Sequence, residues 1–269
     1  MTDDVVTRVL GSPRYRDVDR ALVARLAEEE LPRARNTDDA VKRVKRRLHQ
    51  AVGAYRGGSA STTVDQLRTT WSGAWDEPMR RACRKALERH ASTRERAGEL
   101  DRFYPALWEA IGGAPRSVLD LACGLNPFAL PFMGLAADAE YRACDADGRV
   151  LGEVDAFLAL VGQPHRTWAC DLAVGAPGVE ADVALLLKTF PLLDRQDPHA
   201  TLRLLRGIRA PRIVVSFPTR SLGGRGGLER SYRARMEGLL GELGGRLHST
   251  AELRYKSELA FVLTMAPDG

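Results

Sequence analysis

Apolar residues recur at helical spacing in the front part of the chain. After Thr37, a suitable capping residue followed by two acids, Val41, Val44 and Leu48 come every three or four positions and would share one face of a helix. Similar patterns continue with few breaks, so residues 14–110 are expected to be mostly helical. One face of such helices can pack against a core while the other stays in solvent.

Two breaks divide this helical part. Residues 57–63 are rich in glycine, serine and threonine and are expected to form a loop before a helix at about 77–89. Ser92 with Glu95 three positions later has the spacing of a capping box, which predicts the start of another helix several turns long. We therefore expect an all-helical domain over residues 1–89.

From residue 115 onward, short apolar runs replace the helical spacing. The expected strands cover residues 117–122, 141–145, 167–171, 182–187, 212–217 and 259–263. The intervening stretches 127–136, 148–161 and 194–207 can hold helices. Strands that alternate with helices predict an α/β domain with a mostly parallel, Rossmann-like sheet over residues 90–269.

The charge is unevenly distributed along the 269 residues, of which 44% are hydrophobic, as in a globular protein. The first hundred residues hold 21 Lys+Arg and 15 Asp+Glu, whereas the rest hold 19 and 20, so the basic excess lies at the front. Residues 41–56 contain six basic side chains and no acid. Such a helix can contact a polyanion, although a solvated helix face with no partner has the same pattern.

The cysteines do not indicate a metal site or a disulfide framework. Cys83, Cys123, Cys144 and Cys170 form no C-x-x-C pair and have no histidine cluster near them. We expect no bound metal, strand-end or core packing for Cys123, Cys144 and Cys170, and a reducing cytoplasm as the location. The longest aliphatic run, residues 183–187, is too short to cross a membrane, and the front of the chain lacks the apolar core of a signal peptide.

Candidate ligand-binding residues follow the first three expected strands. Gly124 lies in the turn after the first, Asp145 ends the second, and Asp171 ends the third, 26 residues later. Parallel sheets bind ligands at this edge. The set suits S-adenosylmethionine: Gly124 allows a close backbone approach, Asp145 can accept both ribose hydroxyls, and Asp171 can accept from the adenine amino group. Asp120 would be a charge near the methionine amino group or a brace for the loop.

Two other interpretations of this domain are open. A nicotinamide-binding domain would need G-x-G-x-x-G to hold a pyrophosphate, whereas the turn A-C-G-L-N-P at residues 122–127 has one glycine and a proline. This turn disfavours a pyrophosphate, which S-adenosylmethionine lacks. The remaining interpretation is an α/β domain that has lost its ligand.

Several motifs, colinear over nearly the whole chain, resemble one family. These are DLACGLNP at residues 120–127, SFPTRSLGGRG at 216–226, HASTRER at 90–96, LKTFP at 187–191, and KRRLH at 45–49 followed by GAY at 53–55. The chain is similar to the aminoglycoside-resistance 16S rRNA (guanine(1405)-N(7))-methyltransferases, in particular those of aminoglycoside-producing actinomycetes.

The resemblance implies a class I, Rossmann-like methyltransferase fold behind an N-terminal helical domain that binds rRNA. It implies transfer of the methyl group of S-adenosylmethionine to N7 of guanine 1405 in the 16S rRNA of the 30S subunit, with resistance to kanamycin- and gentamicin-type drugs. We expect a monomer. A methyltransferase of another RNA or of a small molecule, and a non-catalytic RNA-binding assembly factor, stay open as alternatives; the basic front argues against a small molecule.

The resemblance also assigns residues. The implied cofactor contacts are Tyr55, His90, Ala91, Ser92, Arg96, Ala122, Gly124, Asp145, Asp171, Leu172, Leu187 and Gln196, with Arg96 paired to the methionine carboxylate. Guanine N7 carries a lone pair and no proton, so no acid or base catalyst is expected, and catalysis would rest on orientation.

The target base would be turned out of the RNA into a pocket. Lys188, Phe190 and Arg220 are expected to position it. Phe190 or Trp168 could stack on guanine, although core packing is the favoured role for these two rings. The basic residues expected to bind RNA are Lys42, Arg43, Lys45, Arg46, Arg47, Arg220 and Arg225, the last two in a glycine-rich loop that can follow a phosphate backbone.

Overall fold

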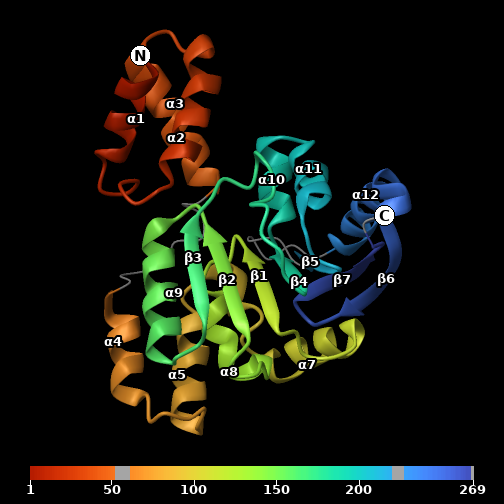
Figure 1. Cartoon of the computed structure of the whole chain (residues 1–269). Helices are drawn as coiled ribbons and strands as arrows, with labels where there is room; N and C mark the ends of the chain where they lie inside the picture. Colours follow the sequence, from red (N-terminus) through yellow and green to blue (C-terminus); the bar gives the residue numbers. More distant parts are fainter. Residues whose placement is uncertain (52–60, 220–226, 268–269) are drawn as a thin grey trace.

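A seven-stranded sheet forms the centre of the molecule in the computed structural model, which describes residues 1–51, 61–219 and 227–267 (Figure 1). The strand order is β3-β2-β1-β4-β5-β7-β6. The strands are β1 Ser117–Leu121, β2 Glu140–Asp145, β3 His165–Ala169, β4 Val183–Leu187, β5 Arg212–Pro218, β6 Leu247–Arg254 and β7 Glu258–Met265. β1 to β5 are parallel, whereas β7 is antiparallel to β5 and β6 is antiparallel to β7. This confirms the expected α/β class and the mostly parallel sheet.

Helices cover both faces of the sheet, as buried parallel strands require. Every residue of β4 is buried, and its side chains alternate between the two cores, with Leu185 on one face and Leu186 on the other. One face is covered by α7 Leu100–Ile111, α8 Leu130–Met133 and α9 Gly148–Leu160. The other is covered by α10 Phe190–Gln196, α11 Ala200–Gly207 and α12 Glu229–Leu243. Short 3-10 turns cover Leu31–Arg33, Asn126–Ala129 and Gly244–Arg246.

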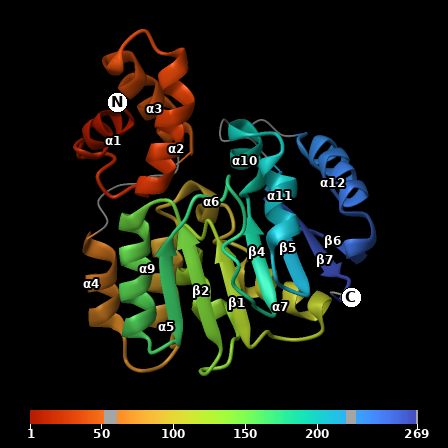
Figure 2. The same cartoon turned by 45° about the horizontal axis from the view of Figure 1, so that its top comes forward.

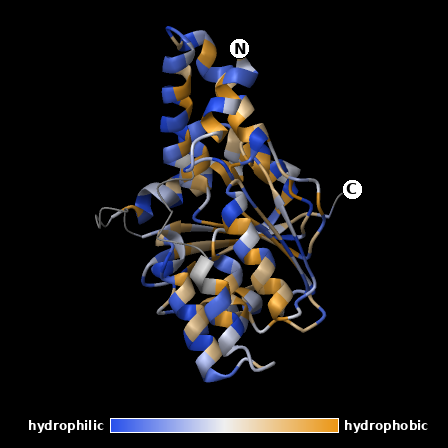
Figure 3. Ribbon diagram, turned by 90° about the vertical axis from the view of Figure 1, so that its left-hand side faces the viewer, coloured by the Kyte–Doolittle hydropathy of each residue, from blue (hydrophilic) through white to orange (hydrophobic). Residues whose placement is uncertain are grey.

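The first three helices form a separate unit, which we call the front module. α1 Thr2–Leu10, α2 Arg20–Glu30 and α3 Thr37–Ala51 bury their own apolar cluster, which includes Val5, Leu26, Val44 and Leu48. Both hydrophilic and hydrophobic positions occur along the helices near the N-terminus, as amphipathic helices require (Figure 3). The module lies beyond the carboxyl ends of β1, β2 and β3 (Figures 1 and 2).

The next two helices belong to the sheet layer by their packing. α4 Ser61–Thr70 packs on α9, and α5 Glu77–Leu87 packs on the turn after β1, so that Leu67 and Met79 share the core of the sheet. The expected boundary at residue 89, between an RNA-binding part and a catalytic part, stays a prediction. By packing, the boundary between the two apolar cores lies earlier, after α3.

One expected helix is wrong in detail. The capping box at Ser92 does not form, and the expected single helix consists of the short α6 Ala91–Arg94 and the separate α7. The Ser92 hydroxyl lies 2.8 Å from Nδ1 of His90, and the Glu95 carboxylate accepts from the Lys188 ammonium, so neither side chain caps the helix. None of the helices among the described residues is long and apolar enough to cross a membrane.

The separate core of the front module predicts separate stability. Leu48→Ala should remove a fully buried side chain from this core and destabilise it by about 2–5 kcal/mol. Native-state hydrogen exchange should then show faster exchange in α1 to α3 and unchanged protection in β1 and β4. Leu185→Ala, in the sheet core, should instead lower protection in the strands. Equal loss of protection everywhere in Leu48→Ala would mean that the two cores unfold as one unit.

Candidate active site

A pocket opens at the carboxyl edge of the sheet, where β1, β2 and β4 end. Its walls come from these strand ends, the α6 turn, the start of α9, α10 and the front module. The lining residues are Leu22, His90, Ser92, Ala122, Gly124, Asp145, Ala146, Asp147, Val150, Cys170, Asp171, Leu172, Leu187, Lys188, Thr189, Leu192, Leu193 and Gln196. The pocket therefore lies where ligands bind in open α/β sheets.

The turn after β1 is built around Gly124. Its φ of 50° is in the left-handed region, and a Cβ there would lie 3.4 Å from Cε1 of His90. The Gly124 amide donates to Oδ2 of Asp145 at 2.9 Å, and the Asp147 amide donates to Oδ1 at 2.9 Å. Burial raises the pKa of Asp145, while these amide donors oppose the rise. The two amides fix the rotamer of the carboxylate at the pocket wall.

Beneath this turn, Asp120 braces the loop. Its Oδ2 accepts from Nδ2 of Asn126 at 2.9 Å and from the Tyr141 hydroxyl at 2.7 Å. The side chain is buried outside the pocket lining, and burial raises its pKa to about 6. Of the two roles considered for Asp120, these contacts support the brace.

Two strand ends adopt left-handed backbone without glycine. Ala122, with φ 55°, follows β1, and Lys188, with φ 60°, follows β4; they are the non-glycine residues with positive φ among the described residues. Such conformations cost on the order of 1–3 kcal/mol each and tend to cluster at ligand sites. Both residues line the pocket, on neighbouring strands. The backbone thus turns sharply at the edge where a ligand would sit.

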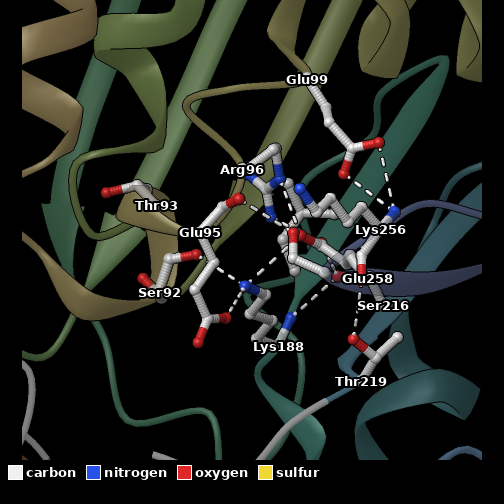
Figure 4. A network of polar contacts seen from close by, with 12 residues as sticks. Ser92, Thr93, Glu95, Arg96, Glu99, Lys188, Ser216, Thr219, Lys256 and Glu258 are labelled. Atoms are coloured by element: carbon white, nitrogen blue, oxygen red, sulfur yellow. Dashed lines mark hydrogen bonds and ion pairs between the residues drawn. The ribbon is translucent and has the colours of Figure 1, made fainter. Parts of the chain in front are cut away.

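The Lys188 ammonium is held in a buried polar network (Figure 4). Nζ donates to the Ser92 carbonyl oxygen at 3.0 Å and to Oε2 of Glu95 at 2.6 Å, and it lies 3.5 Å from Oε2 of Glu258. Glu258 is fully buried on β7. Burial alone would raise the pKa of Glu258, but the charges of Arg96 and Lys188 lower it below its ordinary value.

Arg96 is part of the same network and not of the pocket lining. Its Nε and Nη2 donate to the two oxygens of Glu258 at 3.0 and 2.6 Å, and Nη1 donates to Oδ1 of Asn126 at 2.7 Å. The guanidinium is therefore occupied by internal partners. The expected pairing of Arg96 with a ligand carboxylate stays a prediction that this side-chain arrangement does not support.

The two adenine-side candidates, Asp171 and Gln196, both line the pocket. Asp171 follows β3 by two residues, and its Oδ1 accepts from the Ala173 amide at 3.0 Å. Gln196 ends α10. His90 lines the pocket next to Gly124, and burial lowers its pKa to about 4, so the ring is neutral at pH 7.

The structure brings most of the expected cofactor residues together. Nine of them line the pocket, with Lys188 beside them: His90, Ser92, Ala122, Gly124, Asp145, Asp171, Leu172, Leu187 and Gln196. Ala91 and Arg96 are not in the lining. Tyr55, Arg220 and Arg225 lie outside the described residues.

The aromatic candidates for base stacking differ in their surroundings. Phe190 is fully buried in the core, with its ring edge-on to Phe217 at 5.8 Å between centroids, an arrangement that supports packing over stacking. Trp168 is partly buried on the edge strand β3, with the Arg166 guanidinium 5.6 Å from its ring centroid. Neither ring lines the pocket. Of the cysteines, Cys83, Cys123 and Cys144 are buried and Cys170 is half-buried at the pocket wall.

Sequence reasoning missed the contribution of the front module to the pocket. Leu22, on α2, lines the pocket although it lies far from the strand-end motifs in the chain. Nothing in the local pattern around Leu22 distinguishes it from a core residue of the module. Leu192 and Leu193 were also missed; their place shortly after the fourth strand could have indicated them.

The basic face of α3 is only partly available for a partner. Lys42 and Arg46 are exposed and Lys45 is half-buried. Arg43 instead donates to Asp39 at 3.1 Å, and Arg47 pairs with Glu29. The exposed charge on this face is thus smaller than the sequence suggests.

A mostly parallel sheet, a single-glycine turn after β1 and acids after β2 and β3 define a class I S-adenosylmethionine-dependent methyltransferase. Residues 11–259 match the family described as ribosomal RNA methyltransferase (FmrO), and the chain belongs to this family.

Known proteins similar to this chain cover nearly its whole length. A 16S rRNA (guanine(1405)-N(7))-methyltransferase of Micromonospora echinospora is 39% identical over 97% of this chain and 96% of the relative. One of the same name from Frankia casuarinae is 42% identical over 90% of this chain and 87% of the relative. The crystal structure of the 16S rRNA methyltransferase RmtF in complex with S-adenosyl-L-homocysteine superimposes with a TM-score of 0.84 at 35% identity, covering 98% of both chains. For the 16S rRNA methylase RmtB the TM-score is 0.83 at 30% identity, covering 99% of both.

The buried brace predicts a pH-dependent stability. Because the pKa of Asp120 is raised to about 6 in the folded state, its contribution is fully present below the unfolded-state pKa of 3.8 and is lost as pH rises through about 6. Asp120→Asn does not titrate. From about pH 4 to about pH 7, the unfolding free energy of the variant should therefore gain about 2 kcal/mol relative to the natural chain.

Urea unfolding of both proteins across this pH range measures the difference. Asp138→Asn, at an exposed acid, serves as the control and should track the natural chain at every pH. A constant difference between Asp120→Asn and the natural chain would show that Asp120 is charged in the fold at all these pH values.

Proposed function

We propose that this protein transfers the methyl group of S-adenosylmethionine to N7 of guanine 1405 in 16S rRNA within the 30S subunit. The single observation that carries the proposal is the pocket in which Asp145, fixed by the Gly124 amide, and Asp171 lie at one edge of the sheet. The guanine and its position come from relatives named for that reaction, at 39% and 42% identity.

The residues present fit the cofactor. Gly124 leaves the space that a Cβ would take beside His90, so a ligand can approach the backbone there. Asp145 keeps acceptor capacity beyond its two amide donors and would hold the ribose hydroxyls. Asp171 and Gln196 would hold the adenine, and Leu172 and Leu193 supply apolar walls. No cluster of acids, histidines and cysteines suitable for a metal ion occurs among the described residues.

The reaction requires the protein to orient the base and the methyl donor, and it requires no proton transfer before the attack. The bound cofactor supplies a methyl group on a positively charged sulfur. The guanine N7 lone pair would form a bond to that carbon as the bond between carbon and sulfur breaks, which leaves S-adenosylhomocysteine. No proton has to leave beforehand, so the residues need only hold the base and the donor in line. As positive charge develops on guanine, a bare cation nearby would oppose it. The positive charge of Lys188 is offset by the carboxylates of Glu95 at 2.6 Å and Glu258 at 3.5 Å, which keeps the pocket around Lys188 close to neutral.

The front module is suited to hold the RNA. It contributes Leu22 to the pocket lining, lies beyond the strand ends, and carries Lys42 and Arg46 exposed on α3. These exposed side chains can neutralise phosphates. We assign rRNA docking to residues 1–89, with the front module as its charged part, and Arg220 and Arg225 as further phosphate contacts. The protein would act as a monomer in the cytoplasm, where 30S subunits are found, and confer resistance to kanamycin- and gentamicin-type drugs.

Chemical cleavage at 7-methylguanine tests the proposed reaction. 30S subunits from cells that express the protein are treated with borohydride and aniline, and primer extension locates the break. We expect one new stop at guanine 1405, and no stop with Asp145→Asn, because loss of the carboxylate charge weakens the ribose contact. A stop at another base would reject the assigned target. Absence of any stop while the protein binds S-adenosylhomocysteine would favour a non-catalytic role.

A charge reversal on α3 tests the docking surface. Lys42→Glu with Arg46→Glu should weaken binding to 30S subunits and make the plot of log affinity against log salt shallower by about one to two units. The matched control reverses Arg116 and Arg209, two exposed basic residues that precede β1 and β5 outside the assigned docking region, and should keep the slope of the natural protein. If the α3 variant keeps the natural slope, this helix is not part of the RNA footprint.

A further inference from the structure

One arginine of the front module reaches the adenine end of the pocket. Arg25, on α2, donates from Nε to Oδ2 of Asp171 at 2.6 Å and from Nη2 to Oδ1 at 3.3 Å. Nη2 also donates to Oε1 of Gln196 at 3.2 Å. The pair is largely shielded from water, with 20% of the Arg25 side chain and 7% of the Asp171 side chain exposed. Planar, two-point contacts of this kind fix geometry as well as charge.

Backbone contacts clamp the same part of the module to the loop after β2. The Asp19 amide donates to the Ala146 carbonyl at 2.9 Å, and the Gly148 amide donates to the Asp17 carbonyl at 2.7 Å. A Cβ at Gly148 would lie 2.7 Å from that carbonyl oxygen, so only glycine permits the contact. This loop directly follows the ribose-side Asp145. Contacts from residues 17–25 therefore flank both acids of the pocket.

Arg25 is itself held by an acid of the same helix, on the side away from Asp171. Nη1 of Arg25 donates to Oε1 of Glu29 at 2.6 Å, and the other oxygen of Glu29 pairs with Arg47 on the basic helix α3. Ion pairs thus run from α3 through Glu29 and Arg25 to Asp171. α2 extends from the module toward the strand ends in both views (Figures 1 and 2).

We propose that Arg25 is a positioning residue of the cofactor site. It sets the Asp171 carboxylate and the Gln196 amide in the orientation that receives adenine. Asp171 accepts two hydrogen bonds from Arg25 and one from the Ala173 amide, of about four that a carboxylate can accept. The acceptor position that is left suits one donor, such as an exocyclic amino group. The inference rests on the proposed function only in taking an adenosine-containing ligand.

Isothermal titration with S-adenosylhomocysteine tests this role without RNA. Arg25→Ala should weaken binding about tenfold, and Arg25→Lys, which keeps the charge but not the two-point contact, should fall between Arg25→Ala and the natural protein. The matched control is Arg20→Ala, on the same helix, whose arginine pairs with Asp3 in solvent; its affinity should be that of the natural protein.

A double-mutant cycle separates positioning from general damage. If Arg25 acts through Asp171, then Arg25→Ala should change binding less than about twofold in an Asp171→Asn background. A full tenfold loss in that background, or natural affinity in Arg25→Ala, would overturn the proposal. Should Arg25→Ala fail to fold, Arg25→Lys decides: an unchanged melting temperature with unchanged affinity rejects the role. A natural protein that binds the probe but leaves guanine 1405 unmethylated would reject the proposed function and leave this test intact.

Discussion

A fully buried carboxylate, Glu258, has to be neutralised for this fold to form. Arg96 contacts both of its oxygens, Lys188 lies 3.5 Å away, and the Ser216 hydroxyl donates to it. Removing one partner of such a buried pair costs about 3–5 kcal/mol because the remaining charge has no solvent. The contacts of Glu258 join β7 to the segment between α6 and α7, through Arg96, and to the ends of β4 and β5, through Lys188 and Ser216. The α6 turn and Lys188 form two walls of the pocket. Both are therefore held in place by the charges that compensate Glu258.

The sheet could be predicted from sequence because its strands are buried on both faces. Continuous apolar runs such as residues 183–187, ending next to a turn residue or an acid, have few other interpretations, and Asp145 and Asp171 follow from the same spacing. β6 could not be predicted in this way, since it is an exposed edge strand whose residues are mostly polar. α12 buries only a few positions, among them Met236 and Leu239, so its apolar face is weak.

Side-chain partners were harder to predict than strands. The sequence places Ser92 and Glu95 at capping-box spacing, but Glu95 lies within reach of Lys188, 93 residues away, and a buried ammonium is the stronger partner. The same competition explains Arg96, whose charge is balanced by Glu258, 162 residues away. Local patterns contain no information about such distant charges. The charge count of α3 was misleading for the same reason, because Arg43 and Arg47 pair with acids of the front module.

The left-handed backbone at Ala122 and Lys188 limits how this pocket can vary among related sequences. A β-branched side chain at either position would collide with its own backbone, whereas glycine would adopt the same φ without strain. Substitutions at these two positions in related proteins should thus favour glycine, asparagine or unbranched residues, even where the side chain itself touches no ligand. The shape of the pocket therefore depends on which residues tolerate a positive φ at these two positions, as well as on the chemistry of the lining side chains.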